Sequence, residues 1–241
     1  VTDKIISDGV IRSDSKGGES LFPLYLHDQV GSSLQKSLLE EDQFDTLQKE
    51  ANINGKLIGE LKSVFQKEVS PDEIFYYIYA IFYSNIYRQK YQEFLKTDFP
   101  RVPFTKDYDL FIELGNLGKK LVDLHLLKSP ELNNPTVKFY GDGDNRVKMR
   151  NYQPFQETDG AVKINESQSF DGIAKPVWNY YIGGYQVLDK WLKDRTDRVL
   201  LSEDIKHYCL IATSLIRTIE IQKEIDKLYP EVEKLLYKKQ L

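Results

Sequence analysis

The spacing of apolar residues changes near residue 130 from a helical repeat to a strand repeat, and it becomes helical again toward the C-terminus. From about residue 31 to 127 they recur every three or four positions, as in GKLIGELKSVFQ (55–66) and DYDLFIELGNLGKKLVDLHLL (107–127). In TVKFYGDGDNRVKMRNY (136–152) they alternate, which is typical of a half-buried strand. This order predicts an α+β fold, with a helical scaffold, a small antiparallel sheet or hairpin, and a helical C-terminus.

Capping and proline signals mark the ends of several predicted helices. Ser70, followed by Pro71 and two acidic residues, predicts the start of one helix. The two prolines of DFPRVPF (98–104) predict that helical structure stops before them, because each restricts the preceding residue and lacks an amide donor. The segment 202–229 predicts a long amphipathic helix with acidic residues in its first turn.

Four tyrosines recur at every fourth residue of YAIFYSNIYRQKY (79–91). On a helix they share one face, which suits either a platform for flat rings or the inner wall of a fold. Stacking platforms serve unstacked bases, and the surrounding residues are apolar on other sides of the helix as well, at Phe75, Ile78, Phe82 and Ile86. We therefore expect a buried helix, with some phenol hydroxyls bonded at its margins.

The alternating segment 136–152 predicts a β-hairpin around the turn Gly-Asp-Gly-Asp (141–144). One face of this hairpin is apolar and holds Val137, Phe139, Val147 and Met149. The other face is basic. AVKIN (161–165) predicts a further strand of the same kind, in which Val162 and Ile164 oppose Lys163 and Asn165.

Composition limits the class of protein. The net charge of −4 and the pI of about 5.6 exclude a general basic field, so a polyanion site has to be a local patch. The single cysteine, Cys209, fits a reducing compartment and a buried apolar position. No apolar run reaches the roughly 18 to 20 residues that span a bilayer. We expect a cytoplasmic protein without a membrane partner.

Catalytic motifs are weak in this chain. FYGDG (139–143) matches the Phe-x-Gly-x-Gly pattern of adenine methyltransferases, but the next residues read as a strand rather than a helix, which favours a turn. The Glu60-x-Lys62 pair lies in an amphipathic helix, and the three histidines have no partner at zinc-ligand spacing. We predict no catalytic residue, no metal site and no enzyme activity in this chain alone.

Two blocks carry a resemblance to a known family. EIFYYIYAIFYSNIYRQKYQEFLKTDFPRVPF (73–104), followed by FIELGNLGKKLVDLHLL (111–127), resembles the C-terminal region of Type ISP, or single-polypeptide type I, restriction-modification enzymes and related helicase-methylase proteins. VWNYYIGGYQVLDKWLKDRTDRVLLSEDIKHY (177–208) resembles a second block of that region, and LFPLYL (21–26) resembles a strand near its start. The absence of an initiator methionine agrees with a piece of a longer polypeptide.

The resemblance implies a target recognition domain, which reads duplex DNA and positions it for adenine N6 methylation while controlling restriction by the parent protein. It also implies methyltransferase and helicase domains of the same polypeptide as partners. S-adenosylmethionine, ATP and magnesium are implied for the parent, with no cofactor in this chain. We expect one domain over 1–241, with a strand and helical scaffold in 1–130, a β-rich reading part in 131–199 and C-terminal helices in 200–241.

A DNA reader needs cations that contact phosphates and a few side chains that reach base edges. The hairpin, a cluster of basic residues after it and the Gly-Gly-Tyr loop supply such groups. The predicted DNA-binding residues are Lys138, Tyr140, Arg146, Lys148, Arg150, Asn151, Lys163, Asn165, Gly183, Gly184, Tyr185, Arg195 and Arg198. Lys190 and Lys193 lie in the same basic cluster, whereas Arg88, Lys90 and Arg101 read as structural, with Arg101 suited to a buried ion pair or cap.

Two alternatives stay open at this stage. Each basic cluster can equally be the solvated face of an amphipathic strand or helix. The helices can also belong to a protein-interaction module that docks a neighbouring methyltransferase or helicase domain. The recognised DNA sequence does not follow from residue types, because it depends on which side chain reaches which base edge.

Overall fold

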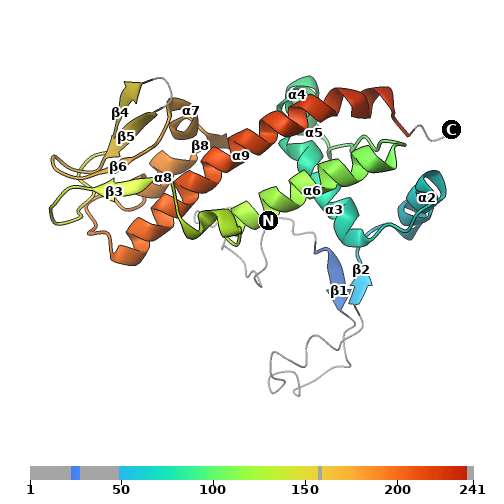
Figure 1. Cartoon of the computed structure of the whole chain (residues 1–241), viewed down its shortest axis with the longest axis horizontal. Helices are drawn as coiled ribbons and strands as arrows, with labels where there is room; N and C mark the ends of the chain where they lie inside the picture. The colour runs from blue at the N-terminus through green and yellow to red at the C-terminus, as the bar shows by residue number, and fades with distance from the viewer. Residues whose placement is uncertain (1–22, 28–48, 157–158, 238–241) are drawn as a thin grey trace, which may run out of the picture.

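The computed structural model describes residues 23–27, 49–156 and 159–237 and has an elongated shape (Figure 1). A helical lobe and a β-containing lobe lie at opposite ends, and one long helix, α9 (Ser202–Lys234), runs through both. The segments that we expected to be strand-like before residue 23, and helical between 31 and 48, lie outside the described residues. The α+β class is confirmed.

Within the part of the chain that the structure describes, the helical lobe contains five helices and a two-stranded antiparallel ribbon, which pack with the C-terminal half of α9. The elements are β1 (Tyr25–His27), β2 (Lys49–Ala51), α2 (Gly55–Phe65), α3 (Pro71–Tyr83), α4 (Asn85–Lys90), α5 (Gln92–Thr97) and α6 (Tyr108–His125). Their apolar faces meet the C-terminal half of α9 in one core, which includes Leu61, Ile74, Phe111, Leu121 and Ile225.

Helix α3 starts where the sequence predicts. The Ser70 hydroxyl accepts a hydrogen bond from the amide of Glu73, and the Glu73 carboxylate accepts one from the amide of Ser70. Helix α3 ends at Ser84, whose backbone is extended, so the four tyrosines do not share one continuous helix. Their buried surroundings agree with the prediction, and the Tyr87 hydroxyl donates to the carbonyl of Arg101 at 3.0 Å.

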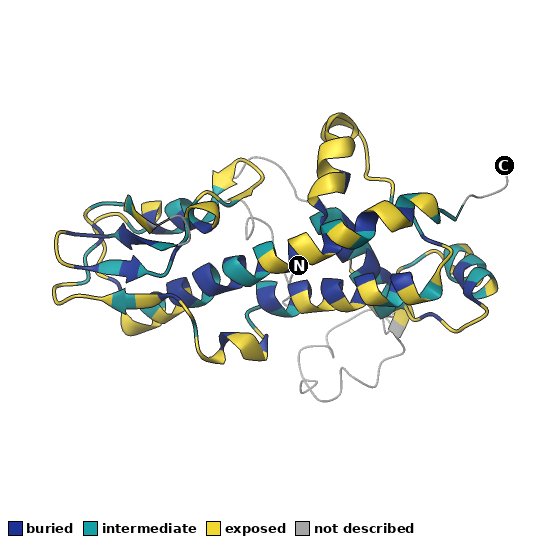
Figure 2. Ribbon diagram, turned by 45° about the horizontal axis from the view of Figure 1, so that its top comes forward, coloured by how far each residue is buried: buried dark blue, intermediate teal, exposed yellow. Residues whose placement is uncertain are grey.

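Close packing of α3 against α6 depends on one glycine. A Cβ atom placed on Gly118 would lie 1.9 Å from the carbonyl oxygen of Tyr76. Only a residue without a side chain allows the two backbones to approach this closely. Figure 2 shows that α6 also lies along α9, with the buried faces of both helices toward the inside of the lobe.

The β-containing lobe holds a four-stranded antiparallel sheet in the order β3-β6-β5-β4. Its elements are η2 (Pro130–Asn133), β3 (Lys138–Tyr140), β4 (Asn151–Gln156), β5 (Asp159–Lys163), β6 (Ser169–Asp171), α7 (Lys175–Trp178), β7 (Tyr181–Ile182), β8 (Tyr185–Gln186) and α8 (Val187–Lys193). Val162, Phe170, Leu188 and Tyr208 belong to the second core, which this sheet forms with α7, α8 and the N-terminal half of α9.

The predicted hairpin over 136–152 is wrong. Strand β3 pairs with β6, and residues 146–150 form no strand. The backbone of Val147 instead bonds to the chain near residue 198, with its amide donating to the carbonyl of Arg198 at 3.0 Å. Val137 and Val147 are buried as the alternation predicts, but alternation does not reveal which segments pair. The strand predicted at 161–165 is present as β5, with Val162 and Ile164 buried.

Helix α9 begins at Ser202, and the Asp204 carboxylate accepts a hydrogen bond from the amide of Leu201. It continues through Pro230 to Lys234, and its 33 residues correspond to a length of about 50 Å. Its Asp226 carboxylate accepts hydrogen bonds from the Ser84 hydroxyl at 2.9 Å and from the Asn85 amide at 2.9 Å. Helix α9 therefore fixes the break between α3 and α4. None of the helices in the described part of the chain is long and apolar enough to span a membrane.

Candidate nucleic-acid interface

The structure brings the two predicted basic clusters together. Residues 145–147 run antiparallel to residues 197–200, with a bridge between Arg146 and Val199. The amide of Asp197 donates to the carbonyl of Val147 at 2.8 Å, and the amide of Leu200 donates to the carbonyl of Asn145 at 2.9 Å. We call the surface formed by residues 142–148 and 197–199 the loop face.

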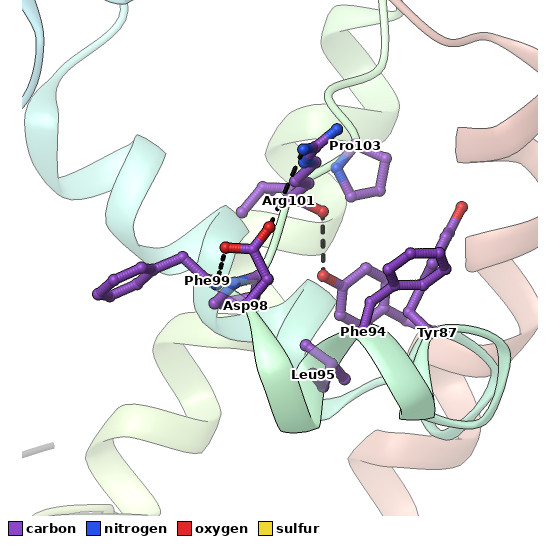
Figure 3. A pocket seen from close by; sticks show the side chains of 10 residues that line it. Tyr87, Phe94, Leu95, Asp98, Phe99, Arg101 and Pro103 are labelled. Atoms are coloured by element: carbon purple, nitrogen blue, oxygen red, sulfur yellow. Dashed lines mark hydrogen bonds and ion pairs between the residues drawn. The ribbon is translucent and has the colours of Figure 1, made fainter.

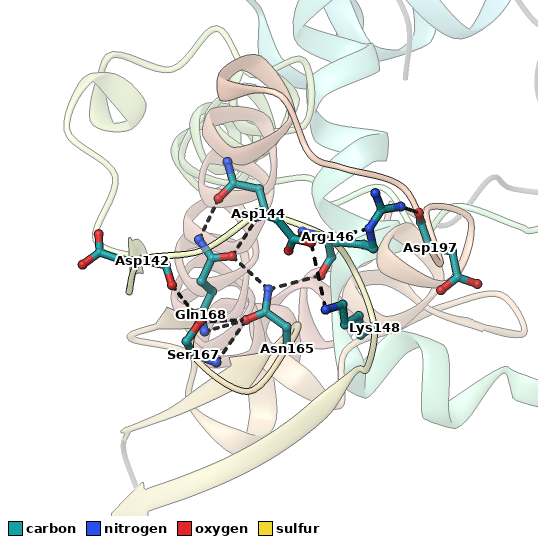
Figure 4. A network of polar contacts seen from close by, with 9 residues as sticks. Asp142, Asp144, Arg146, Lys148, Asn165, Ser167, Gln168 and Asp197 are labelled. Carbon is teal, nitrogen blue, oxygen red and sulfur yellow. Dashed lines mark hydrogen bonds and ion pairs between the residues drawn. The ribbon is translucent and has the colours of Figure 1, made fainter.

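Two buried amide side chains hold the loop face in place (Figure 4). The Gln168 side-chain oxygen accepts from the amide of Asn145 at 2.9 Å, and its nitrogen donates to the Asn145 side-chain oxygen at 2.7 Å. Asn165 donates to Gln168 at 2.9 Å and to the carbonyl of Arg146 at 3.2 Å. The prediction that Asn165 reads DNA is contradicted, because its side chain is 5% exposed and is committed to internal hydrogen bonds.

The charged side chains of the loop face lie around Asp144. The Arg146 guanidinium is 3.6 Å and the Lys148 ammonium 4.0 Å from the Asp144 carboxylate, and both side chains are exposed. A hydrogen bond from the amide of Arg146 lowers the pKa of Asp144, and the two cations lower it further. Arg198 is exposed beside them. The Arg146 guanidinium also donates to the carbonyl of Asp197 at 2.5 Å, and Asp142 and Asp197 are exposed on the same face. Arg146, Lys148 and Arg198 are thus accessible from solvent, with three aspartates as local competitors.

Two predicted DNA-binding arginines join elements of the lobe instead. Arg150 donates to the Asp189 carboxylate on α8 at 2.9 Å and to the Thr196 hydroxyl at 3.3 Å. The Arg195 guanidinium lies 3.7 Å from the centroid of the Trp191 ring and 3.7 Å from the Asp204 carboxylate. Both side chains are more than two-thirds buried. Their first role is structural, because phosphate contact would break these ion pairs.

The remaining predicted residues lie along the sheet and at a hairpin tip. Lys138 and Tyr140 are exposed on edge strand β3, and Lys138 donates to the Asn134 side chain at 3.0 Å. Asn151 and Lys163 face each other across β4 and β5, with Asn151 exposed and Lys163 half-buried.

Gly183 and Gly184 form the turn between β7 and β8, and Gly183 has a positive φ of 59°, as a sharp turn requires. Tyr185 is 63% exposed beside this turn.

One surface was missed by the sequence reasoning. A groove of about 390 Å³ lies between α4, α5 and the segment 98–103, lined by Tyr91, Phe94 and Pro100 among others (Figure 3). Helix α5 has no buried residue, and Phe94 is 70% exposed. One sequence signal could have revealed this surface, namely the short segment between Tyr91 and the prolines at 100 and 103. A helix in so short a segment has too few turns to bury all of its apolar residues. Arg101 was expected to be structural, suited to a buried ion pair or cap as well as to a phosphate contact; its side chain is 94% exposed and lies 4.0 Å from the Asp98 carboxylate.

Titratable side chains meet where the lobes join, beside a hollow of about 520 Å³. The Tyr79 hydroxyl lies 2.8 Å from His125 Nδ1, and His125 Nε2 lies 3.0 Å from the Thr218 hydroxyl. Thr218 donates its proton to the carbonyl of Ser214, so it accepts from Nε2, and Nδ1 accepts from Tyr79. Burial lowers the pKa of His125 to about 4. This contact agrees with the packing role that its position at the end of α6 suggests.

Groups for covalent or metal chemistry are few. Cys209 is buried, as predicted, and burial raises the pKa of its thiol to about 11. Among the described residues there is no group of three or more histidine, cysteine, aspartate or glutamate side chains that could hold a metal ion.

The family model for the Type ISP C-terminal specificity domain matches residues 1–224. The chain belongs to this family. A search of curated proteins found no match. The specificity domain therefore contains both lobes and the first two-thirds of α9, and the loop face, the hairpin of β7 and β8 and the α5 groove all lie within it.

Two solved structures share the fold of this specificity domain. The first is the ATP-dependent Type ISP restriction-modification enzyme LlaBIII bound to DNA, with a TM-score of 0.57 and 22% identity over 83% of this chain. The second is a DrdV–DNA complex, with a TM-score of 0.56 and 20% identity over 75% of this chain. The matched parts make up 13% and 20% of those chains, so most of each protein lies outside the match.

Proposed function

We propose that this specificity domain recognises duplex DNA, with the loop face as a principal contact surface. The observation that carries this is the pairing of residues 145–147 with 197–200, which unites Arg146, Lys148 and Arg198 on one surface of a protein that is acidic overall. Family membership supports it, and both structural neighbours are DNA complexes.

The loop face is suited to phosphate contact more than to base readout. Its exposed cations are guanidinium and ammonium groups, which fix a protein on the DNA backbone, and they lie among the exposed carboxylates Asp142, Asp144 and Asp197. Its amide side chains are used internally. Base contacts are then left to exposed polar groups nearby in the sequence, such as Asn151 and Tyr140. Adenine methylation and control of restriction belong to the same proposal. S-adenosylmethionine, ATP and magnesium would bind other parts of the polypeptide.

Salt dependence tests the contact surface directly. The full-length protein with Arg146→Ala and Lys148→Ala should bind duplex DNA more weakly, and the slope of log affinity against log salt should fall by about 0.9 for each phosphate that the variant no longer neutralises. Lys56 and Lys227, both exposed and remote from the loop face, changed together to alanine give a charge-matched control. An unchanged slope in the Arg146 and Lys148 variant would refute the assignment.

The α5 groove favours a second function, docking of another domain of the same polypeptide. Phe94 and Phe99 are 70% and 75% exposed beside the groove. Neighbouring apolar side chains exposed to water are unfavourable, and such patches mark contact surfaces. In both structural neighbours the matched part is at most 20% of the chain, so a large remainder is available to cover such a surface. Helix α5 also lies in the helical lobe, away from the sheet (Figure 1).

A photo-crosslinking residue tests this docking. When it replaces Phe94 in the full-length protein, we expect crosslinks to peptides outside this 241-residue sequence. The same residue in place of Phe155, which is 57% exposed on β4, is the control for an exposed aromatic position on the other lobe. Crosslinks from position 94 that stay within the 241 residues would count against docking.

A further inference from the structure

The hairpin of β7 and β8 has a rigid base and an apolar tip. The amide of Val187 donates to the carbonyl of Tyr180 at 3.0 Å, which closes the hairpin at its base. The Tyr180 hydroxyl donates to the Gln222 side chain on α9 at 3.3 Å, and Gln222 donates to the carbonyl of Tyr83 at 3.1 Å. Both lobes therefore anchor the hairpin.

The side chains at the tip are exposed and mostly apolar. Tyr181 is 56%, Ile182 48% and Tyr185 63% exposed. Ile182 pairs with Tyr185 across the turn and Tyr181 pairs with Gln186, so Tyr185 and Ile182 share one face of the hairpin and Tyr181 lies on the other face. Three large exposed side chains on five consecutive residues of an anchored hairpin are costly to leave in water, and such clusters mark contact surfaces.

Gly184 is not required by the fold. Its φ is not positive, and a Cβ atom placed on it would meet nothing within 4 Å. Gly183 differs, because its φ of 59° is strained for other residues. A glycine that neither backbone conformation nor packing demands is suited to close approach by an outside surface.

The hairpin is joined to the proposed DNA contact surface through α8. Strand β8 is followed directly by α8, whose first turn contains Asp189. Arg150, two residues after the loop-face segment 142–148, donates to Asp189 and to Thr196.

The Lys190 ammonium lies 5.7 Å from the centroid of the Tyr185 ring. Lys190 also forms an ion pair with Asp194 on the exposed surface of α8. A cation therefore lies beside the aromatic tip, and it has to exchange Asp194 for a phosphate when DNA binds.

We propose that this hairpin is a wedge, which inserts Tyr181 and Tyr185 against the bases of the bound duplex and locally unstacks them. The proposal rests on the proposed function and adds the contact made to the bases. Stacked bases inside a duplex offer no open ring face, so an aromatic side chain gains stacking contact only where a base step opens. Anchoring by both lobes supplies the stiffness that such insertion needs.

Four variants of the full-length protein test the wedge. The first changes Tyr181 and Tyr185 together to alanine, and the second is Gly184→Val, which adds bulk where the fold has room. Phe155→Ala is the control for an exposed aromatic residue outside the hairpin, and Gly59→Ala is the control for an exposed glycine with nothing within 4 Å. Equal unfolding temperatures of the hairpin variants and the unchanged protein establish that folding is intact.

The probe is a duplex selected from a random pool by the unchanged protein, with 2-aminopurine placed at each adenine position in turn. We expect the unchanged protein and both controls to raise the fluorescence at one position, where a base loses its stacking partner. The tyrosine variant should lose this rise and bind about 5- to 100-fold more weakly per stacked base, and Gly184→Val should lose it as well.

The outcomes separate this inference from the proposed function. If the unchanged protein enriches no duplex, the proposed function fails. If it binds a selected duplex and no position responds, or if the hairpin variants respond as the unchanged protein does, the wedge is refuted and DNA recognition stands. A loss of affinity in the tyrosine variant without loss of the fluorescence rise would show a surface contact and would also refute the wedge.

Discussion

Replacement of His125 by glutamine should remove one specific pH dependence of stability. In the folded protein His125 is neutral, donates to Thr218 through Nε2 and accepts from Tyr79 through Nδ1. A glutamine side chain offers one donor and one acceptor for the same two partners, but it does not titrate. His125→Gln therefore tests the histidine charge with little change in the hydrogen bonds.

The magnitude follows from the lowered pKa. Burial lowers the pKa of His125 from 6.5 to about 4, so the unfolded chain binds more protons than the folded chain between these values. The contribution to stability is complete above about pH 6.5 and is lost as the pH falls toward 4. At 1.36 kcal/mol per pH unit, the loss is about 0.8 kcal/mol at pH 6, about 2 kcal/mol at pH 5 and about 3 kcal/mol at pH 4.

Urea unfolding between pH 7 and pH 4 measures this difference. Carboxylates titrate in the unchanged protein and in the variant alike, so the difference between their free energies of unfolding isolates His125. Between pH 7 and pH 5 the free energy of unfolding should fall by about 2 kcal/mol more in the unchanged protein than in the variant. His207→Gln, at an exposed position, is the control for replacing a histidine. Parallel curves for His125→Gln and the unchanged protein would show that His125 is not held neutral by burial.

Three further changes test the scaffold. Gly118→Ala should cost several kcal/mol of stability or prevent folding, because its Cβ would lie 1.9 Å from the Tyr76 carbonyl oxygen; thermal unfolding measures this, and a cost below about 1 kcal/mol would contradict the close contact. Asp226→Ala should cost about 1.5–3 kcal/mol in urea, since it removes the charged acceptor of the Ser84 hydroxyl, whereas a neutral result would mean that water replaces it. Cys209 should resist iodoacetamide at pH 8 in the folded protein and react in urea, because burial raises the pKa of its thiol to about 11; equal labelling rates would contradict this burial.

The sequence predicts local features well. The start of α3 depends on Ser70, Pro71 and Glu73, which lie within one turn, so their pattern is sufficient to place it. The burial of Val137 and Val147 likewise follows from alternation within a short segment. The α+β class rests on the sum of such local patterns, and the family resemblance rests on contiguous motifs.

Contacts between distant residues account for what the sequence does not reveal. The pairing of residues 145–147 with 197–200 depends on Gln168 and Asn165, which hold the loop from about 20 residues away. Arg150 was expected on a DNA-reading face, because the pattern around it does not reveal its acceptor. That acceptor, Asp189, comes from a helix 39 residues later. Alternation and charge describe one segment at a time, so neither pattern distinguishes an arginine that binds phosphate from one that joins two elements.

Helix α9 has a consequence for exchanging specificity between relatives. A natural boundary for such an exchange is the segment from 136 to 199, which contains the sheet and the loop face. The core under that sheet, however, is completed by Tyr208, Ala212 and Leu215 of α9, and Phe170 packs against Tyr208 with ring centroids 4.2 Å apart. A chimera that receives only residues 136–199 and keeps the α9 of the recipient would combine core residues from two different proteins. Exchange should therefore succeed only when the transferred piece extends to about residue 216, with the joint inside the helix.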